Sequence, residues 1–350
     1  MVCAHYPTRS GPRKSMQDRP LELDCALRAV SEACAVTRHV QSDLDQIRQL
    51  TKDDRSPVTV ADFAAQAIVA SRLNDELGDL SLVGEESAAD LRGLTSTSLP
   101  HAITEAVRQI RPQISDEEVL DAIDLGNHDA SDATYWTLDP VDGTKGFLRR
   151  GQYAVSLALI ENGEVKLGVL GCTNLSADFN REFNDPDPVG SIFYAQADNG
   201  AWYLPANNID LAPTPIRAAS QVTLDALRIC ESVEAAHSKQ DDTARILEHL
   251  KATSRPARLD SQCKYAVVGR GQADAYLRLP TGVGYVEKIW DHAAGMVVAE
   301  EAGAIVTDMF GNRLDFSRGA TLATNQGVVC TAPTIHPQII QAIETLGIKP

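Results

Sequence analysis

Apolar residues recur every three or four positions in the first part of the chain, which is the spacing of a helix with one buried face. One such pattern predicts a helix from Leu21 to about Leu50, with apolar positions at Leu23, Leu27, Val30 and Cys34. A second pattern follows Pro57 and predicts a helix from about Ala61 to Leu77. The polar and then acidic stretch from Glu85 to Asp139 is expected to be an elaborated surface connection, with some helix around Ile103 to Ile110.

The middle of the chain changes to strand-like segments arranged around short turns. The segments Tyr153–Ile160 and Val165–Gly171 flank a turn at Glu161–Glu164, and Ile192–Ala195 and Ala201–Leu204 flank a turn at Asp198–Gly200. Asn-Gly within each turn is typical of a tight hairpin. The pattern therefore predicts an antiparallel sheet.

The last third alternates between helical and strand-like patterns. We expect a helix at Asp241–Lys251, a strand at Tyr265–Val268, a helix at Asp291–Glu301, a strand at Ala304–Thr307 and a final helix opened by Pro337. Prolines 205, 213 and 215 mark a candidate boundary before this part. The predicted class is α/β, with an α+β domain over residues 20–205, an α/β domain over residues 206–350 and a flexible tail over residues 1–19.

Composition narrows the functional classes. The chain of 350 residues carries 48 acidic against 32 basic residues, a formal net charge of −16. This balance disfavours binding to nucleic acid or to an anionic membrane, because both need a basic face. No apolar run approaches the roughly 20 residues that span a bilayer. We expect a monomer whose partner is a small molecule.

The seven cysteines are scattered and odd in number, and no two of them form a Cys-x-x-Cys pair. This pattern indicates neither a disulfide framework nor a thiolate zinc site, and it favours a reducing compartment, taken here to be the cytoplasm. The first twenty residues contain several basic residues but no apolar core. They are expected to form a flexible tail, and an organelle-targeting role stays open.

Acidic residues are concentrated between residues 116 and 142, where nine occur without any Lys or Arg. Most of this run, Asp116 to Asp132, is expected to be solvated surface. Its end differs, because an apolar segment from Trp136 leads into a turn that places Asp139 and Asp142 three residues apart. Carboxylates this close repel each other unless a cation lies between them. Oxygen ligands without histidine or thiolate favour Mg²⁺, Ca²⁺ or Mn²⁺ over zinc.

Two further acidic sites accompany this pair. Glu85 and Glu86 follow an apolar segment, and Asp291 stands at the start of a predicted helix. Each has a structural explanation by itself, as an exposed turn or as a helix cap, and the same holds for an Asp-capped turn at Asp139. Their joint occurrence favours a metal site.

At these positions the chain resembles a known family. The segments Gly84–Ser87, Asp139–Thr144 and Trp290–Gly295 resemble, in order, the three signatures of the inositol monophosphatase-like superfamily of lithium-sensitive, magnesium-dependent phosphatases. The flanking sequence is most similar to the 3'(2'),5'-bisphosphate nucleotidases of the fungal and plant type. The supporting segments are Lys52–Thr59, Asp142–Arg149, Asp260–Tyr265, Tyr276–Pro280 and Glu287–Asp291. The resemblance implies a layered αβαβα fold.

The resemblance also implies a set of metal ligands. Glu85, Asp139 and the carbonyl of Val141 would hold a first Mg²⁺ ion, and Asp139, Asp142 and Asp291 would hold a second. A third, weaker Mg²⁺ near Glu85 is implied as well. Glu86 would either contact these ligands without binding the metal itself or form a structural salt bridge.

The resemblance implies that Asp54 and Thr144 activate the attacking water, with the Asp54 carboxylate orienting the Thr144 hydroxyl. The backbone amides of Gly143 and Thr144 would face the phosphate. The bisphosphate nucleotide would contact Ser261, Lys264 and Arg278, with His237 near its base or sugar. Trp290 and His292 are interpreted as packing residues. The stretch from residue 258 to 288 has five basic and three acidic residues, so it carries a local charge of +2 in an acidic chain.

Three hypotheses follow for function. The leading one is a Mg²⁺-dependent phosphatase that removes the 3'-phosphate from adenosine 3',5'-bisphosphate and from 3'-phosphoadenylyl sulfate, with a role in sulfate assimilation and salt tolerance as the resemblance implies. The nearest alternative is an inositol phosphate phosphatase, since only the pocket would differ. A non-catalytic nucleotide or cation sensor is a third, which the complete acid set disfavours.

Overall fold

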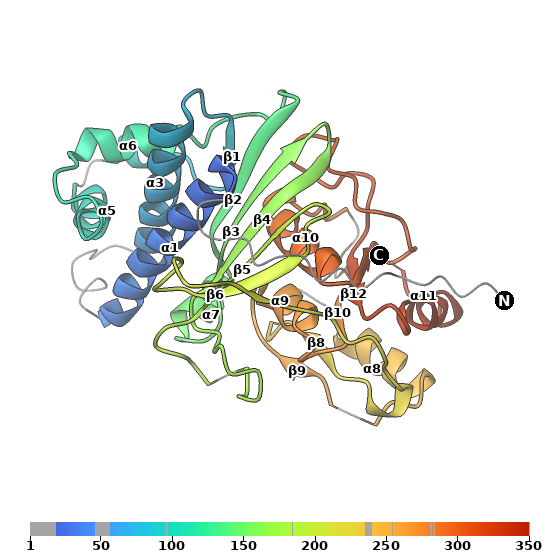
Figure 1. The fold of residues 1–350 in the computed structure, drawn as a ribbon. Coiled ribbons are helices and arrows are strands. Elements are labelled where there is room, and N and C mark those ends of the chain that lie inside the picture. The colour runs from blue at the N-terminus through green and yellow to red at the C-terminus, as the bar shows by residue number, and fades with distance from the viewer. Residues whose placement is uncertain are drawn as a thin grey trace.

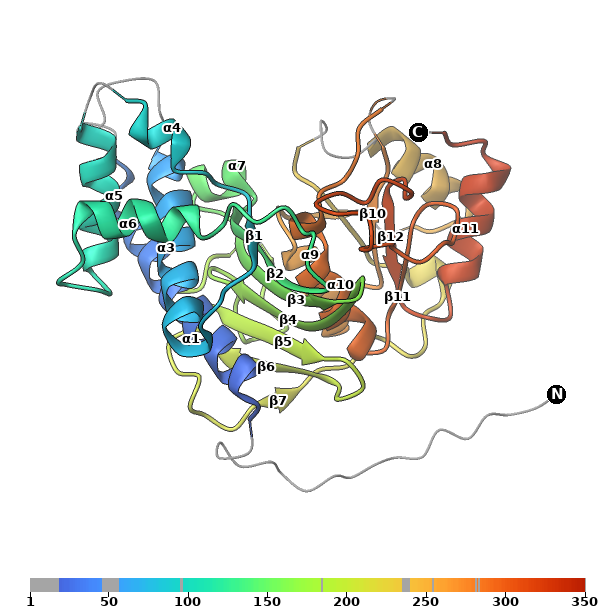
Figure 2. The ribbon, with the colours of Figure 1, turned by 90° about the horizontal axis from the view of Figure 1, so that it is seen from above.

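The computed structural model describes residues 19–45, 57–94, 97–183, 185–234, 240–253, 255–280, 282 and 284–349. Its helices and sheets alternate in five layers, helix, sheet, helix, sheet and helix, as Figures 1 and 2 show. This arrangement confirms the expected α/β class and the layered αβαβα fold. Among the described residues, no helix has the length and apolar character that crossing a bilayer requires.

The first layer contains two long helices, α1 (Leu21–Ser42) and α3 (Pro57–Leu77). The two helices pack against each other, and both reach the strands behind them. Both were expected; α1 ends at Ser42, and residues 46–50 of the predicted helix lie outside the described part of the chain. Two shorter helices, α5 (Ser98–Arg108) and α6 (Asp116–Asp124), pack on α3, and the short α4 (Ala89–Arg92) packs on α6. The stretch interpreted as a surface connection is therefore more helical than predicted.

The acidic run begins as a solvated helix face. Ser115 and Glu118 form a reciprocal capping box at the start of α6, which satisfies backbone donors that a helix start leaves free. Arg92 forms ion pairs with Glu117, Asp121 and Asp124 at 2.8, 2.8 and 3.3 Å. The solvated-surface interpretation of this helix is confirmed.

The second layer is a seven-stranded sheet in sequence order. Its strands are β1 (Leu82–Gly84), β2 (Thr134–Asp142), β3 (Ala154–Glu161), β4 (Glu164–Cys172), β5 (Ser191–Gln196), β6 (Ala201–Pro205) and β7 (Thr214–Pro215). Neighbours are antiparallel except β1 and β2, which are parallel. Asn162 and Gly163 both have positive φ angles, 51° and 77°, as a tight hairpin turn requires. Both predicted hairpins are confirmed.

The middle layer holds α9 (Cys263–Gly269) and α10 (Ala293–Glu301) between the two sheets. The predicted strand at Tyr265–Val268 is wrong, because these residues lie in α9. Every residue of α9 is buried, and a short, wholly apolar run does not distinguish a buried helix from a buried strand. Helix α10 packs closely against β4, since a Cβ atom on Gly168 of β4 would lie 2.4 Å from the side chain of Val297 in α10.

The fourth layer is a five-stranded mixed sheet in the order β11, β12, β10, β8, β9. Its strands are β8 (Ile229–Glu231), β9 (Ala257–Arg258), β10 (Ala275–Arg278), β11 (Ile305–Thr307) and β12 (Val328–Thr331). The outer helices are α8 (Gln240–His249) and α11 (His336–Thr345), and a 3₁₀ turn, η4 (Ile289–Asp291), precedes α10. A second 3₁₀ turn, η2, spans Leu224–Ala226.

The division of the chain into domains at residue 205 stays a prediction. Strand β7 lies beyond that residue and still pairs with β6. Helix α10, from the later part of the chain, packs on β4 and β5 of the first sheet. The two sheets therefore share the helical layer between them, and a large core cluster joins residues from both.

Candidate active site

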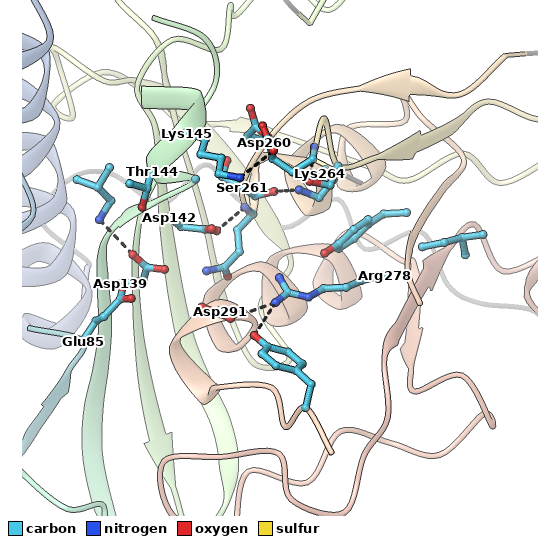
Figure 3. Close-up of a pocket in the computed structure, with 18 residues that line it drawn as sticks. Glu85, Asp139, Asp142, Thr144, Lys145, Asp260, Ser261, Lys264, Arg278 and Asp291 are labelled. Atoms are coloured by element: carbon cyan, nitrogen blue, oxygen red, sulfur yellow. Dashed lines mark hydrogen bonds and ion pairs between the residues drawn. The ribbon is translucent and has the colours of Figure 1, made fainter. Parts of the chain in front are cut away.

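A cavity of about 400 Å³ opens between the ends of the two sheets. Figure 3 shows the carboxylates of Glu85, Asp139 and Asp142 on one side of it, called the acidic side below, and Lys264 and Arg278 on the other, called the basic side. Asp260 and Asp291 reach the cavity from the same part of the chain as the basic residues. Ten of the residues proposed from the sequence line the cavity, namely Glu85, Asp139, Val141, Asp142, Gly143, Thr144, Ser261, Lys264, Arg278 and Asp291. The other two, Asp54 and His237, lie outside the described residues.

The end of β2 positions the first two carboxylates. Asp139 is 3% exposed and lies opposite Ser156 of β3, after which the register shifts before Asp142 pairs with Ala154. Oδ1 of Asp139 accepts a hydrogen bond from the N–H of Val141 at 3.1 Å, which bends the strand locally. The shift places both carboxylates at the cavity.

Gly143 then turns the chain into the short helix α7 (Thr144–Leu148). Its φ angle is 90°, which a residue with a side chain rarely adopts, and an added Cβ would lie 3.0 Å from the Cβ of Ser261. Glycine is thus required both by the turn and by the contact with the segment from Asp260 to Ser261. The turn leaves Thr144 exposed at the cavity.

Glu85 reaches the same place from β1. The parallel pairing of β1 with β2 continues past Gly84, because the N–H of Glu85 donates to the carbonyl of Leu138 at 3.2 Å. The residue after β1 therefore lies beside Asp139, although the two are far apart in the sequence. Figure 3 shows the two carboxylates side by side.

Gln66 of α3 fixes the segment that carries Glu85. Its amide donates to the carbonyl of Glu86 at 2.6 Å and to that of Ile123 at 3.0 Å, and its oxygen accepts from the N–H of Glu86 at 3.1 Å. The side chain is fully buried. A Cβ atom on either Gly84 or Gly126 would come within 2.5 Å of this amide, so both glycines make room for it.

Asp291 comes from the C-terminal part of the chain, where it ends the 3₁₀ turn η4 before α10. The buried Gln262 links it to the motif Asp139–Thr144. The backbone N–H of Gln262 donates to Oδ2 of Asp142, and its side chain both donates to the carbonyl of Trp290 at 2.8 Å and accepts from the N–H of Gly295 at 2.9 Å. One residue thus holds two of the candidate ligand segments together.

The electrostatics of this acidic side fit a cation. Loss of bulk water around Glu85, and then the charges of Asp291 and Glu86, raise its pKa to about 7. Burial and repulsion from Asp291 raise the pKa of Asp142 to about 6, although Lys264 acts in the opposite direction. Burial, followed by the charge of Glu85, raises the pKa of Asp139 well above its usual value. Mutual repulsion of this kind is relieved by hard divalent cations, and the donors here are all oxygen.

A further carboxylate, Asp62, lies against this cluster and was missed by the sequence analysis. It is 8% exposed and stands one helical turn before Gln66 on the same face of α3. Burial, and then the charges of Glu86 and Glu85, raise its pKa well above the usual value, and its own charge acts on Asp139. The signal was present in the sequence, since an acid on an otherwise apolar helix is unusual.

The basic side consists of buried or half-buried groups. Nζ of Lys264 donates to the carbonyl of Ser261 at 2.7 Å and lies 5.1 Å from the centre of the Tyr276 ring. Burial lowers its pKa. Arg278, at the end of β10, forms an ion pair with Glu287 at 2.7 Å and a longer one with Asp291 at 3.3 Å.

His292 is fully buried, as a packing residue would be, and it also has two polar contacts. Its Nδ1 lies 2.9 Å from the hydroxyl of Tyr265, and its Nε2 lies 3.2 Å from Oε2 of Glu287. Burial opposes the charge on Glu287, but His292 and Arg278 outweigh it and lower the pKa of Glu287 to about 2. The packing interpretation of His292 is therefore incomplete.

Charged residues also connect the two sheets at the mouth of the cavity. Glu234 forms ion pairs with Lys145 at 2.9 Å and with Arg149 at 2.5 Å, and Arg149 pairs with Asp260 at 2.6 Å. These ion pairs connect α7 and the residue after it, which follow β2 of the first sheet, to residues that follow β8 and β9 of the second sheet.

Known proteins share both the fold and much of the sequence. The five-layer fold is that of the inositol monophosphatases: the enzyme of Anabaena (Nostoc) sp. PCC 7120 matches with a TM-score of 0.59 at 20% identity, covering 94% of this chain and 96% of that one. CysQ of Bacteroides thetaiotaomicron, a bacterial member of the inositol monophosphatase family, also matches with a TM-score of 0.59 at 20% identity, over 89% and 97% of the two chains.

The chain belongs to the inositol monophosphatase family, whose model matches residues 22–347. Among curated relatives, the 3'(2'),5'-bisphosphate nucleotidase of Schizosaccharomyces pombe is 42% identical over 344 residues, covering 94% of this chain and 96% of the relative. The 3',5'-bisphosphate nucleotidase 2 of Arabidopsis thaliana is 38% identical over 336 residues, covering 92% and 95%. The resemblance found in the sequence is thereby confirmed.

Proposed function

We propose that this chain is a Mg²⁺-dependent phosphatase that hydrolyses the 3'-phosphate of adenosine 3',5'-bisphosphate to give AMP and phosphate, and that it acts likewise on 3'-phosphoadenylyl sulfate. The observation that carries the proposal is that one cavity holds a carboxylate cluster, formed by Glu85, Asp139, Asp142 and Asp291, together with the cationic groups of Lys264 and Arg278. The names of the relatives, which are bisphosphate nucleotidases from fungi and plants, support the substrate.

Metal dependence is a property of the family, and the donor set here suits Mg²⁺. Glu85, Asp139 and the Val141 carbonyl would hold one ion, Asp139, Asp142 and Asp291 would hold a second, and a third would bind near Glu85. Bound Mg²⁺ would neutralise phosphate oxygens and lower the pKa of the attacking water. Asp139 is central to this proposal, since it is the most buried of these carboxylates.

Thr144 is proposed to hold the attacking water through its hydroxyl, and a carboxylate is proposed to orient that hydroxyl and take up the proton. Two carboxylates compete for this role. Asp54 was assigned it from the sequence and lies outside the described residues. Asp62 is a second candidate, because it lies on α3, which packs against the helix that begins at Thr144. The backbone N–H groups at Gly143 and Thr144 can receive the phosphate, since glycine allows close approach.

The second phosphate of the nucleotide is proposed to bind the basic side. Lys264 and Arg278 line the cavity, and Ser261 stands between them and Gly143. His237 is proposed near the base or sugar. A substrate with two phosphates would use both parts of the cavity at once. One phosphate would bind the Mg²⁺ ions held by the carboxylates, and the other would bind the cationic groups.

The cellular setting of the reaction is part of the same proposal. A monomer acting in the cytoplasm fits the six cysteines of the described residues, which are all free and buried. Roles in sulfate assimilation and salt tolerance would follow from removal of the bisphosphate nucleotide. Size-exclusion chromatography with light scattering tests the monomer directly.

The substrate is tested by measuring phosphate release from adenosine 3',5'-bisphosphate and from an inositol bisphosphate, each with and without Mg²⁺. A higher kcat/KM for the nucleotide, lost on chelation, is the expected result. A higher value for the inositol compound would make the protein an inositol phosphate phosphatase, and no turnover of either would leave a sensor. Millimolar lithium is expected to inhibit, and full activity in its presence would count against the nucleotidase.

A further inference from the structure

A chain of hydrogen bonds lies behind the basic side of the cavity. It begins at the hydroxyl of Tyr265, which is 2.9 Å from Nδ1 of His292, and continues from Nε2 of His292 to Oε2 of Glu287 at 3.2 Å. Glu287 then meets Arg278, whose Nε donates to Oε1 at 2.9 Å and whose Nη2 lies 2.7 Å from Oε2. The side chains of these residues are mostly withdrawn from water, with Glu287 6% and His292 0% exposed.

The guanidinium of Arg278 stands between two carboxylates. Its contact with Glu287 is bidentate, the strongest geometry for such a pair, whereas its contact with Oδ2 of Asp291 is a single one at 3.3 Å. Oxygen atoms of Glu287 and Asp291 lie within 4.8 Å of each other. Figure 3 shows the guanidinium of Arg278 next to Asp291, with a dashed line for this contact.

The same cluster of Glu287, Asp291 and His292 has the spacing of a metal site. Its contacts argue against that use. Both carboxylate oxygens of Glu287 are held by Arg278, and both ring nitrogens of His292 are within hydrogen-bond distance of protein atoms. A cation here would have to displace a guanidinium from a bidentate pair. Of these three residues, Asp291 alone is among those that line the cavity.

Arg278 is therefore a competitor for Asp291. A guanidinium that formed a bidentate pair with Asp291 would occupy the oxygen atoms that a divalent cation needs. Glu287 prevents this because it binds the same edge of the guanidinium more closely. His292 and Tyr265 in turn fix the orientation of the Glu287 carboxylate.

We propose that Glu287 is a positioning residue that retains Arg278 and thereby leaves Asp291 available to a divalent cation. The proposal rests on the assignment of Asp291 as a ligand in the proposed function. Glu287 itself would contact neither metal nor substrate. The buried His292 and Tyr265 would hold the Glu287 carboxylate in the orientation that retains Arg278.

The test is a titration of the full chain with MgCl₂ in the absence of substrate, followed by tryptophan fluorescence, since Trp290 is adjacent to Asp291. Glu287→Gln keeps the shape of the side chain and removes its charge. We expect the dissociation constant for Mg²⁺ to rise about tenfold, as couplings between neighbouring groups commonly reach this size. An unchanged constant would overturn the proposal.

A general loss of negative charge could weaken Mg²⁺ binding without any role for Arg278. To separate the two explanations, Glu287→Gln is also introduced into a chain that already carries Arg278→Met. If Glu287 acts through Arg278, the substitution no longer changes the constant in that background. A rise of the same factor in both backgrounds would show an effect of charge alone and would overturn the proposal.

Asp274→Asn is the matched control. Asp274 is a buried carboxylate paired with Arg228 at 2.6 Å, and it precedes β10, whose other end carries Arg278. Loss of this pair should leave the Mg²⁺ constant unchanged. If Glu287→Gln does not fold, as judged by circular dichroism, Tyr265→Phe replaces it, because it loosens the same chain without changing charge. A raised constant in Tyr265→Phe supports the proposal, and a wild-type value overturns it.

The outcome is distinguishable from failure of the proposed function. If the wild-type chain binds no Mg²⁺ at all, the metal site and this inference fail together. If the wild-type chain binds Mg²⁺ and Glu287→Gln binds it equally well, only the inference fails.

Discussion

The backbone N–H of Gln262 donates a hydrogen bond of 2.5 Å to Oδ2 of Asp142, joining residues that are 120 positions apart. Since the side chain of Gln262 also binds the backbone on either side of Asp291, this residue sets the spacing between two proposed metal ligands. The candidate site therefore depends on how α9 is placed between the sheets, and not only on the two acidic motifs.

Asp139→Asn is expected to abolish activity while making the metal-free protein more stable. Asp139 is buried among other carboxylates that raise its pKa, so an amide removes repulsion and can still accept from the N–H of Val141. Phosphate release should fall roughly 100-fold or more, as even groups behind metal ligands account for 10- to 100-fold effects. The unfolding temperature in EDTA at neutral pH should rise. A lower unfolding temperature would contradict the electrostatic interpretation.

The stability of the metal-free protein is expected to fall as the pH rises. The folded-state pKa of Glu85, about 7, is above its ordinary value of 4.5, so the folded state binds the proton more tightly than the unfolded state does. The stabilisation is fully present below pH 4.5 and is lost as the pH rises through about 7. Asp142, with a pKa of about 6, acts in the same direction.

Unfolding temperatures measured across this range in EDTA and in millimolar Mg²⁺ check the prediction. A bound cation favours the ionised carboxylates, so Mg²⁺ should reduce the slope. Burial also raises the pKa of Glu300 to about 7, and Glu300 does not line the cavity, so a residual slope should persist with Mg²⁺. Identical slopes in the two conditions would argue against cation binding at Glu85 and Asp142.

Asp62→Asn and Asp54→Asn distinguish the two candidates for orienting Thr144. We expect Asp54→Asn to lower kcat roughly 100-fold with little change in KM, which is the usual size of an acid–base contribution. Asp62→Asn serves as the comparison and should retain most activity, since Asp62 is not among the residues that line the cavity. The opposite ranking would transfer the role to Asp62.

Gln66→Ala is expected to weaken metal binding through the segment that carries Glu85. The substitution leaves the N–H of Glu86 and the carbonyls of Glu86 and Ile123 without the partner that Gln66 provides, which should lower the free energy of unfolding by about 1–3 kcal/mol. The Mg²⁺ concentration needed for half-maximal activity should rise as well.

Gln152→Ala is the control for Gln66. Gln152 is a buried amide that donates to the carbonyls of Asn174 and Phe183 at 3.0 and 2.6 Å, and it is not among the residues that line the cavity. Gln152→Ala should lower the free energy of unfolding about as much as Gln66→Ala does, but should leave the Mg²⁺ concentration for half-maximal activity unchanged. An equal change in both variants would assign Gln66 a purely structural role.

Local patterns in the sequence were enough to predict the elements with a clear period and most of the residues that line the cavity. The hairpins around residues 161–164 and 198–200 could be predicted because turn chemistry and alternation are local properties. Glu85, Asp139, Asp142 and Asp291 could be named because each stands in a motif that resembles a known family.

The contacts that those residues make depend on the packing of the layers, which local sequence patterns do not predict. The run Tyr265–Val268 forms a helix because it is buried on all sides between two sheets, an environment that local pattern does not contain. Asp62, Gln66 and Glu287 stand outside the three motifs, and their importance follows from contacts across the fold. Such contacts are set by packing between layers, since carboxylates distant in sequence repel or bind only once the sheets have brought them together.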